Sequence, residues 1–169
     1  FVSPLYEDDH VYETMKLFES FHYDIPREIL SGIAITFRDA GHVLGSAMVE
    51  VECKENGSTK RFLEGGDLGR VHTPILRDPW VPGEFDVVMM ESTYGNRDHD
   101  PVEAMDGRLA QIIRDTVGRG GKIVIPSFAL ERAQEVVYAL RRLEHDPNVP
   151  RLPVYVDSPM ALQALQFYQ

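Results

Sequence analysis

The chain has 169 residues and a net charge of −10, and 43% of its residues are hydrophobic and 26% charged. This composition is typical of a globular domain and excludes a disordered acidic tail, a collagen-like repeat and a coiled coil. No apolar run approaches the roughly 18 residues that span a membrane, and the first residues lack the pattern of a signal peptide. The single cysteine, Cys53, cannot form an internal disulfide, so a reducing, cytoplasmic location is favoured and a cysteine-based zinc finger is excluded.

The first half of the chain predicts one helix followed by short antiparallel strands. Apolar side chains recur at helical spacing in the first segment and alternate with polar ones in the later segments. Asn56 and Gly57 favour positive φ, so they predict a hairpin turn between the last two strands. The expected elements are a helix at 7–18 and strands at 33–37, 47–53 and 60–63.

The second half alternates short apolar runs with amphipathic segments. This order favours right-handed crossovers and a Rossmann-like parallel sheet, so the whole chain is predicted to be of the α/β class. Ligands of such sheets bind beyond the carboxyl ends of the strands. The expected elements are a strand at 86–90, a helix opening with a capping box at 100–103, a strand at 122–125, a helix at 130–143, a strand at 153–156 and a helix from residue 159.

Polar side chains follow each of these three strands. Glu91 ends the first apolar run, and a carboxylate in that position must find a partner or water. Ser127 and Ser158 follow the second and third strands. Each serine is a candidate for substrate contact, and equally a candidate cap of the helix that comes next.

Two loops of the first half carry residue types that bind metals. His42 lies between Gly41 and Gly45, where the backbone can approach a bound group closely. Asp67 lies among glycines after a strand, which is also a common position for a turn residue. Neutral imidazole and carboxylate together suit divalent zinc, but two ligands do not complete a zinc site.

Two arginines are candidates for phosphate contacts, because the guanidinium fork matches phosphate oxygens. Arg97 follows the strand end at Glu91, and Arg132 lies in the first turn of the expected helix at 130–143. A helix N-terminus also favours an anion. An ordinary structural role is the alternative for each arginine.

Five segments, taken in this order, resemble the β-CASP family of metallo-β-lactamase-fold nucleases. The family includes ribonuclease J and the cleavage subunit of the eukaryotic pre-mRNA 3′-end machinery. One such segment would be a weak signal, but five in the family's order are specific. They are residues 39–47 (DAGHVLGSA), 66–70 (GDLGR), 91–95 (ESTYG), 126–134 (PSFALERAQ) and 156–161 (VDSPMA).

The resemblance implies a fold and a reaction. Residues 1–85 would be the later part of a metallo-β-lactamase-like domain, and residues 86–169 the start of a β-CASP domain. His42 would bind one zinc ion, Asp67 would bridge two, and Glu91 would be the acidic catalytic residue of the first β-CASP motif. Two Zn²⁺ ions would then support an in-line cleavage of RNA, as an endonuclease or a 5′-exonuclease. RNA would be the partner, and a homodimer is compatible with the sequence.

The chain also departs from the family. The signature His-x-His-x-Asp-His is absent, as are the two later β-CASP histidine motifs. We therefore expect an internal segment of a longer enzyme, and we expect this segment alone neither to hold a dizinc centre nor to cleave RNA.

Three other functions remain open. A β-CASP scaffold paralogue would keep the fold without catalysis, although the presence of His42, Asp67 and Glu91 favours an active parent. A metallo-β-lactamase-fold hydrolase of another substrate is disfavoured by the segment from residue 91 to 161, which would cover the site with a nucleic-acid-binding lid. A simple nucleotide-binding module is disfavoured because neither common phosphate-loop pattern occurs.

Overall fold

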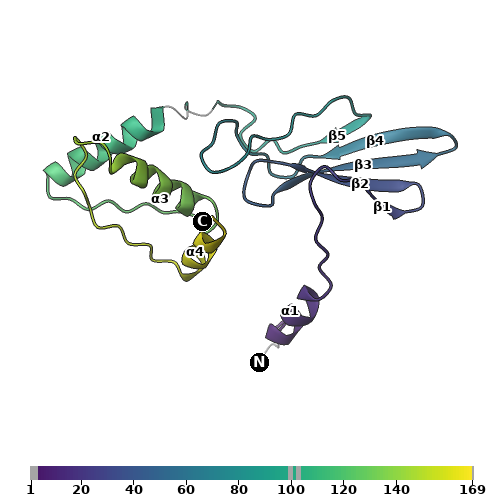
Figure 1. Cartoon of the computed structure of the whole chain (residues 1–169), viewed down its shortest axis with the longest axis horizontal. Helices are drawn as coiled ribbons and strands as arrows, with labels where there is room; N and C mark the ends of the chain where they lie inside the picture. Colours follow the sequence, from purple (N-terminus) through teal and green to yellow (C-terminus); the bar gives the residue numbers. More distant parts are fainter. Residues whose placement is uncertain (1–3, 99–100, 102–103, 169) are drawn as a thin grey trace.

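The computed structural model describes residues 4–98, 101 and 104–168. It consists of a sheet at one end of the molecule and a group of helices at the other (Figure 1). The predicted α/β class is confirmed. The elements in chain order are α1 (Asp8–Met15), β1 (Arg27–Leu30), β2 (Ile33–Asp39), β3 (Ala47–Glu55), β4 (Ser58–Glu64), β5 (Val87–Met89), α2 (Met105–Gly118), α3 (Arg132–Leu143), α4 (Pro159–Ala164) and the short 3₁₀ helix η2 (Leu165–Tyr168).

The sheet has five strands in the order β1-β2-β3-β4-β5. The first three pairings are antiparallel, and β5 joins β4 in parallel. The predicted turn between β3 and β4 is confirmed, because Asn56 and Gly57 have φ of 50° and 78°, the left-handed values that a tight hairpin needs. The pattern did not predict β1, which pairs along the outer edge of β2.

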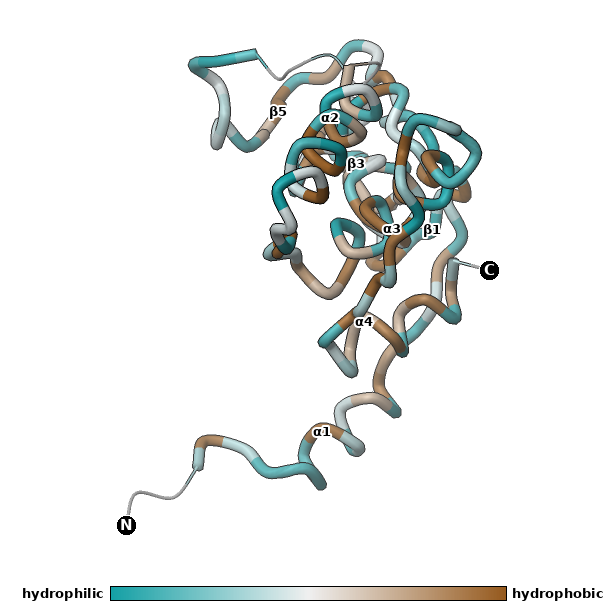
Figure 2. Tube along the Cα trace, turned by 90° about the vertical axis from the view of Figure 1, so that its left-hand side faces the viewer, coloured by the Kyte–Doolittle hydropathy of each residue, from teal (hydrophilic) through white to brown (hydrophobic). Residues whose placement is uncertain are grey.

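Helix α1 confirms the first predicted helix over a shorter range. Glu7 precedes it in a capping box with His10, which explains where the helix begins. The helix buries none of its residues, and Figure 2 shows it standing away from the rest of the molecule. The apolar side chains of α1 therefore remain exposed and pack against no core in this structure.

The predicted three-stranded parallel sheet of the second half is wrong in this structure. Its first strand is β5, but residues 122–125 and 153–156 form no strand in the part of the chain that the structure describes. Val124 and Tyr155 are 86% and 87% exposed. A parallel sheet is stable when helices cover both of its faces. Here α2 and α3 pack against each other, with Ile123 against their shared core, and leave no covered face for such strands.

The molecule has two small apolar cores, one in the sheet region and one between helices α2 and α3. Beneath the sheet lie Ala40, Met48 and Leu63, with Trp80 and Phe85 packed against them. Between α2 and α3 lie Ala110, Ile113 and Leu143. The strand β5 belongs to the sheet of the first half, although it follows the predicted domain boundary at residues 85 and 86. That division stays a prediction, as does the capping box at residues 100–103, most of which lies outside the described residues.

A buried ion-pair network crosses the sheet at Glu50 of β3. Glu50 is 4% exposed and accepts hydrogen bonds from Arg38 on β2 at 2.9 Å and from Arg61 on β4 at 2.5 Å. Burial alone would raise the pKa of Glu50, but the bonds from Arg61 and Arg38 outweigh it and the pKa lies below 4.5. The two guanidinium groups stack on Trp80 and Phe85, which ties the network to the apolar core.

Candidate active site

The loop that carries His42 connects β2 to β3 and is closed by side-chain hydrogen bonds. Gly41 and Gly45 have φ of 63° and 84°, which residues with a Cβ rarely adopt. The Asp39 carboxylate accepts from the Gly41 amide at 2.9 Å, and the Ser46 hydroxyl accepts from the His42 amide at 3.0 Å. Asp39 and Ser46 therefore fix the loop from its two ends, a role that the sequence pattern did not assign to them.

The loop that carries Asp67 lies directly on the His42 loop. The Gly69 amide donates to the Ala40 carbonyl at 2.8 Å. A Cβ on Gly69 would lie 1.7 Å from the carbonyl oxygen of Gly41, so only glycine fits at this crossing. The crossing places Asp67 Oδ2 3.9 Å from His42 Nε2. Two residues that are 25 positions apart in the sequence thus present an imidazole and a carboxylate to the same space.

Glu91 reaches the same place from the end of β5. Its Oε1 atom accepts a hydrogen bond from the Leu68 amide at 2.8 Å, next to Asp67. That bond, a second one from the Thr93 hydroxyl and the nearby His42 lower the pKa of Glu91. The carboxylate is therefore ionised at neutral pH, and it is held by the main chain of the Asp67 loop.

The donor chemistry at this point fits a divalent cation in part. His42 and Asp67 are 45% and 78% exposed, so both side chains can reach an ion from solvent. Imidazole nitrogen with carboxylate oxygen is a normal donor set for zinc. Within the described ranges no group of three histidine, cysteine, aspartate or glutamate side chains is placed to hold a metal. The described residues thus offer two potential donors at this point, and a complete zinc site needs more.

The structure gives three of the predicted substrate-binding residues local contacts. Arg97 stacks on the Tyr94 ring at 4.5 Å. The Ser127 hydroxyl donates to the Ile125 carbonyl at 3.4 Å. The Ser158 hydroxyl accepts from the Ala161 amide at 3.2 Å and caps α4. For Ser158 the capping alternative is therefore realised.

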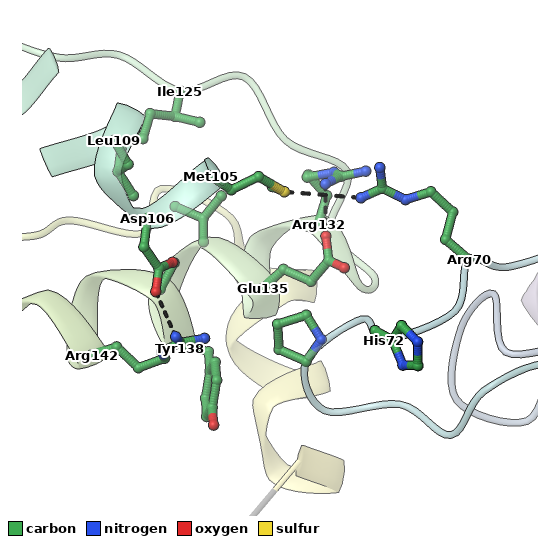
Figure 3. Close-up of a pocket in the computed structure, with 13 residues that line it drawn as sticks. Arg70, His72, Met105, Asp106, Leu109, Ile125, Arg132, Glu135, Tyr138 and Arg142 are labelled. Atoms are coloured by element: carbon green, nitrogen blue, oxygen red, sulfur yellow. Dashed lines mark hydrogen bonds and ion pairs between the residues drawn. The ribbon is translucent and has the colours of Figure 1, made fainter. Parts of the chain in front are cut away.

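The fourth predicted residue, Arg132, lines a pocket between α2, α3 and the loop after Asp67. The cavity has a volume of about 480 Å³. Arg132 pairs with Glu135 at 2.7 Å, and Arg142 pairs with Asp106 at 2.7 Å. Arg70 enters from the opposite side, on the loop of Asp67 (Figure 3).

Comparison with known proteins gives no match to a family model. Individual proteins do match. A ribonuclease of Thermus thermophilus is 40% identical over 139 residues, covering 82% of this chain and 31% of that protein. The endoribonuclease YSH1 of Kluyveromyces lactis is 32% identical over 98% of this chain and 22% of its own length. An RNase J-like protein of Methanocaldococcus jannaschii is 32% identical over 90% of this chain and 36% of its own.

These relatives are β-CASP metallo-β-lactamase nucleases. This chain belongs to the β-CASP family. It spans between about a fifth and a third of the length of the relatives it matches. The resemblance inferred from the five motifs is thereby confirmed.

Two residues near the His42 loop were missed by the sequence analysis. Glu131 precedes α3 with φ of 68° and is 8% exposed. Burial raises the pKa of its carboxyl group, and the field of His42 acts against that shift. Tyr168 of η2 donates to it at 2.7 Å. Glu131 lies within a quoted motif but had no expected role, and nothing in the pattern singled out Tyr168.

No helix in the described part of this β-CASP chain is long and apolar enough to cross a membrane.

Proposed function

We propose that the whole protein is a zinc-dependent phosphodiesterase that cleaves RNA in processing or decay. One observation carries this proposal: His42, Asp67 and Glu91 converge from three separate segments of the chain. The names of the relatives support the substrate class, since each is called a ribonuclease or endoribonuclease or is described as RNase J-like.

In this proposal His42 and Asp67 hold part of a centre of two Zn²⁺ ions. When bound, such ions activate water near neutral pH and stabilise charge on the phosphate. Asp67 would be a ligand of this centre, and Glu91 keeps its negative charge beside His42 because of its bond to the Leu68 amide. The remaining ligands come from outside the residues described above.

The proposal also covers the substrate contacts, the division into domains, the cellular location and the oligomeric state. The path of the RNA backbone is lined by four residues: Arg97, Ser127, Arg132 and Ser158. Residues 1–85 act as the metallo-β-lactamase-like part and residues 86–169 as the start of the β-CASP part. The protein acts in the cytoplasm, in keeping with its single free thiol at Cys53, and can form a homodimer.

The test uses the complete reading frame that contains these residues. Purified protein is incubated with end-labelled RNA, with and without a chelator, alongside His42→Ala, Asp67→Asn and a His145→Ala control. We expect cleavage that the chelator and the first two substitutions abolish and that the control retains. Ladder-like release of mononucleotides would identify 5′-exonuclease action, and internal fragments would identify endonuclease action.

Three results would contradict the proposal. Cleavage that survives both the chelator and His42→Ala would exclude this metal centre as its source. A complete protein with bound zinc but no activity on RNA or DNA would favour the scaffold alternative. Hydrolysis of a small ester or lactam without RNA cleavage would favour a hydrolase of another substrate.

A further inference from the structure

The pocket beside Arg132 carries positive charge on a strongly acidic chain. Three arginines line it (Arg70, Arg132 and Arg142), against two carboxylates, Asp106 and Glu135. Arg132 and Arg142 are each neutralised by a carboxylate at 2.7 Å. The chain as a whole has a net charge of −10, so this pocket has the opposite sign of charge to the chain as a whole.

Arg70 has no acidic partner in the part of the chain that the structure describes. Its Nη2 atom contacts the Met105 sulfur at 4.0 Å, which is a weak interaction for a cation. Figure 3 shows the guanidinium groups of Arg70 and Arg132 pointing toward one another across the mouth of the pocket. Glu135 offsets the charge of Arg132, so the charge that remains without a carboxylate partner among the described residues of this pair is that of Arg70, and it favours an anion at this position.

The rest of the pocket is apolar and is large enough for a small molecule. Leu109, Ile125 and Val136 line its wall, and the Tyr138 ring lies at its edge. The volume of about 480 Å³ lies within the range of about 300–1,000 Å³ typical of ligand sites. A ligand that satisfies both halves of the pocket has an anionic group and a flat, largely apolar group.

The loop that brings Arg70 into the pocket is held in a demanding conformation. His72 and Ile75 have φ of 60° and 78° without being glycine. The His72 amide donates to the Asp78 carboxylate at 2.6 Å, which stabilises the turn. The position of Arg70 is therefore imposed by its own loop and does not result from an ion pair.

We propose that this pocket binds a nucleotide, with the phosphate between Arg70 and Arg132 and the base against the apolar wall. Guanidinium pairs are the usual partners of phosphate oxygens, and an aromatic ring beside an apolar surface accepts a base by stacking. The pocket contains none of His42, Asp67 and Glu91, so this proposal holds whether or not the whole protein is a nuclease. The nucleotide can be free or a unit of an RNA chain.

The test measures binding to the complete protein that contains these residues, in the presence of EDTA, so that no metal contributes. Titration calorimetry is carried out with AMP, adenosine, inorganic phosphate and the dinucleotide ApA. We expect AMP to bind at least tenfold more tightly than adenosine or phosphate alone, because only AMP occupies both halves of the pocket. Tighter binding of ApA than of AMP would identify a unit of an RNA chain as the ligand, and the reverse would identify a free nucleotide.

Variants locate the binding to the pocket. Arg70→Gln should weaken AMP binding about tenfold or more, whereas Arg141→Gln, one position from Arg142 on the same helix and paired outside the pocket with Glu144, should leave it unchanged. Ala139→Leu fills the cavity without removing charge and should also weaken binding. Circular dichroism confirms that each variant is folded.

Several outcomes would overturn the proposal: no AMP binding by the complete unsubstituted protein, equal affinity for adenosine and AMP, or unchanged binding in both Arg70→Gln and Ala139→Leu. None of them bears on RNA cleavage by the complete protein, which is tested separately through His42 and Asp67.

Discussion

Tyr168 of η2 donates a hydrogen bond of 2.7 Å to Oε2 of Glu131, which stands 37 positions earlier at the start of α3. The backbone of Leu44, in the His42 loop, also interacts with the tyrosine oxygen. Burial, together with the Glu131 carboxylate, raises the pKa of Tyr168 to about 12. The end of the described chain is thereby joined both to the helix region and to the loop of the candidate metal site.

Removal of the Tyr168 hydroxyl should destabilise the helix region. Tyr168→Phe leaves the buried Glu131 carboxylate without this bond, and its Oε1 atom already has no partner among the described residues. We expect a loss of about 1–2 kcal/mol in the free energy of unfolding, measured in urea. Tyr155→Phe, at an exposed tyrosine, is the matched control and should change nothing. Equal stability of the two variants would show that the bond contributes nothing.

Glu50→Gln should weaken the sheet. The substitution leaves Arg38 and Arg61 close together without the carboxylate that separates them, in a partly buried position. The expected loss is about 2 kcal/mol in urea unfolding. Glu13→Gln removes an exposed ion pair with Lys16 in α1 and should cost less than about 0.5 kcal/mol. A loss at Glu50 no larger than at Glu13 would contradict the role of the network.

The same carboxylate predicts a pH dependence. The pKa of Glu50 in the folded chain lies below its ordinary value of 4.5. Its contribution to stability is therefore present at neutral pH and is lost as the pH falls below about 4.5 toward the folded-state value. Urea midpoints between pH 7 and pH 3 should show the gap between the unsubstituted chain and Glu50→Gln closing at the acidic end. A gap that is constant with pH would mean that ionisation of Glu50 is not its source.

Two glycine substitutions should have opposite effects. Gly69→Ala places a Cβ 1.7 Å from the Gly41 oxygen, so the two loops must separate, at a cost of about 2–3 kcal/mol. Gly107→Ala, inside α2 with nothing within 4 Å of the new Cβ, should stabilise the chain by about 0.5–1 kcal/mol. Thermal unfolding measures both. A harmless Gly69→Ala would show that the loops do not touch in solution.

Ser158→Ala distinguishes the cap from a substrate contact. The hydroxyl accepts from the Ala161 amide, so its loss should destabilise the chain by about 1 kcal/mol. If Ser158 acts only as a cap, RNA affinity of the complete protein stays the same under conditions where the variant is folded. Weaker RNA binding with unchanged stability would instead support the substrate role.

Local sequence patterns predicted the local structure well. The hairpin at Asn56 and Gly57 and the helix α3 depend on neighbours within a few residues, and both formed as expected. The pairing of residues 122–125 and 153–156 depends on surfaces far away in the chain. An apolar run indicates that a segment is buried in the folded protein, but it does not indicate which other segment buries it.

The candidate site was predictable to a similar degree. The order of the five motifs identified His42, Asp67 and Glu91 as candidate site residues, and the structure places them together. The side chain of Ser158 could not be assigned, because a serine before Pro159 suits a cap and a ligand contact equally. Tyr168 was missed since a single tyrosine in an amphipathic stretch carries no pattern of its own.

The close approach of Gly69 to Gly41 joins the loop of His42 to the loop of Asp67. The spacing of the imidazole and the carboxylate is set there by main-chain atoms, so neither loop can shift alone. Three residues after Asp67 the same loop delivers Arg70 to the basic pocket. If a bound cation moves Asp67 and Arg70 together, the cation and a ligand held by Arg70 must change each other's affinity by the same factor.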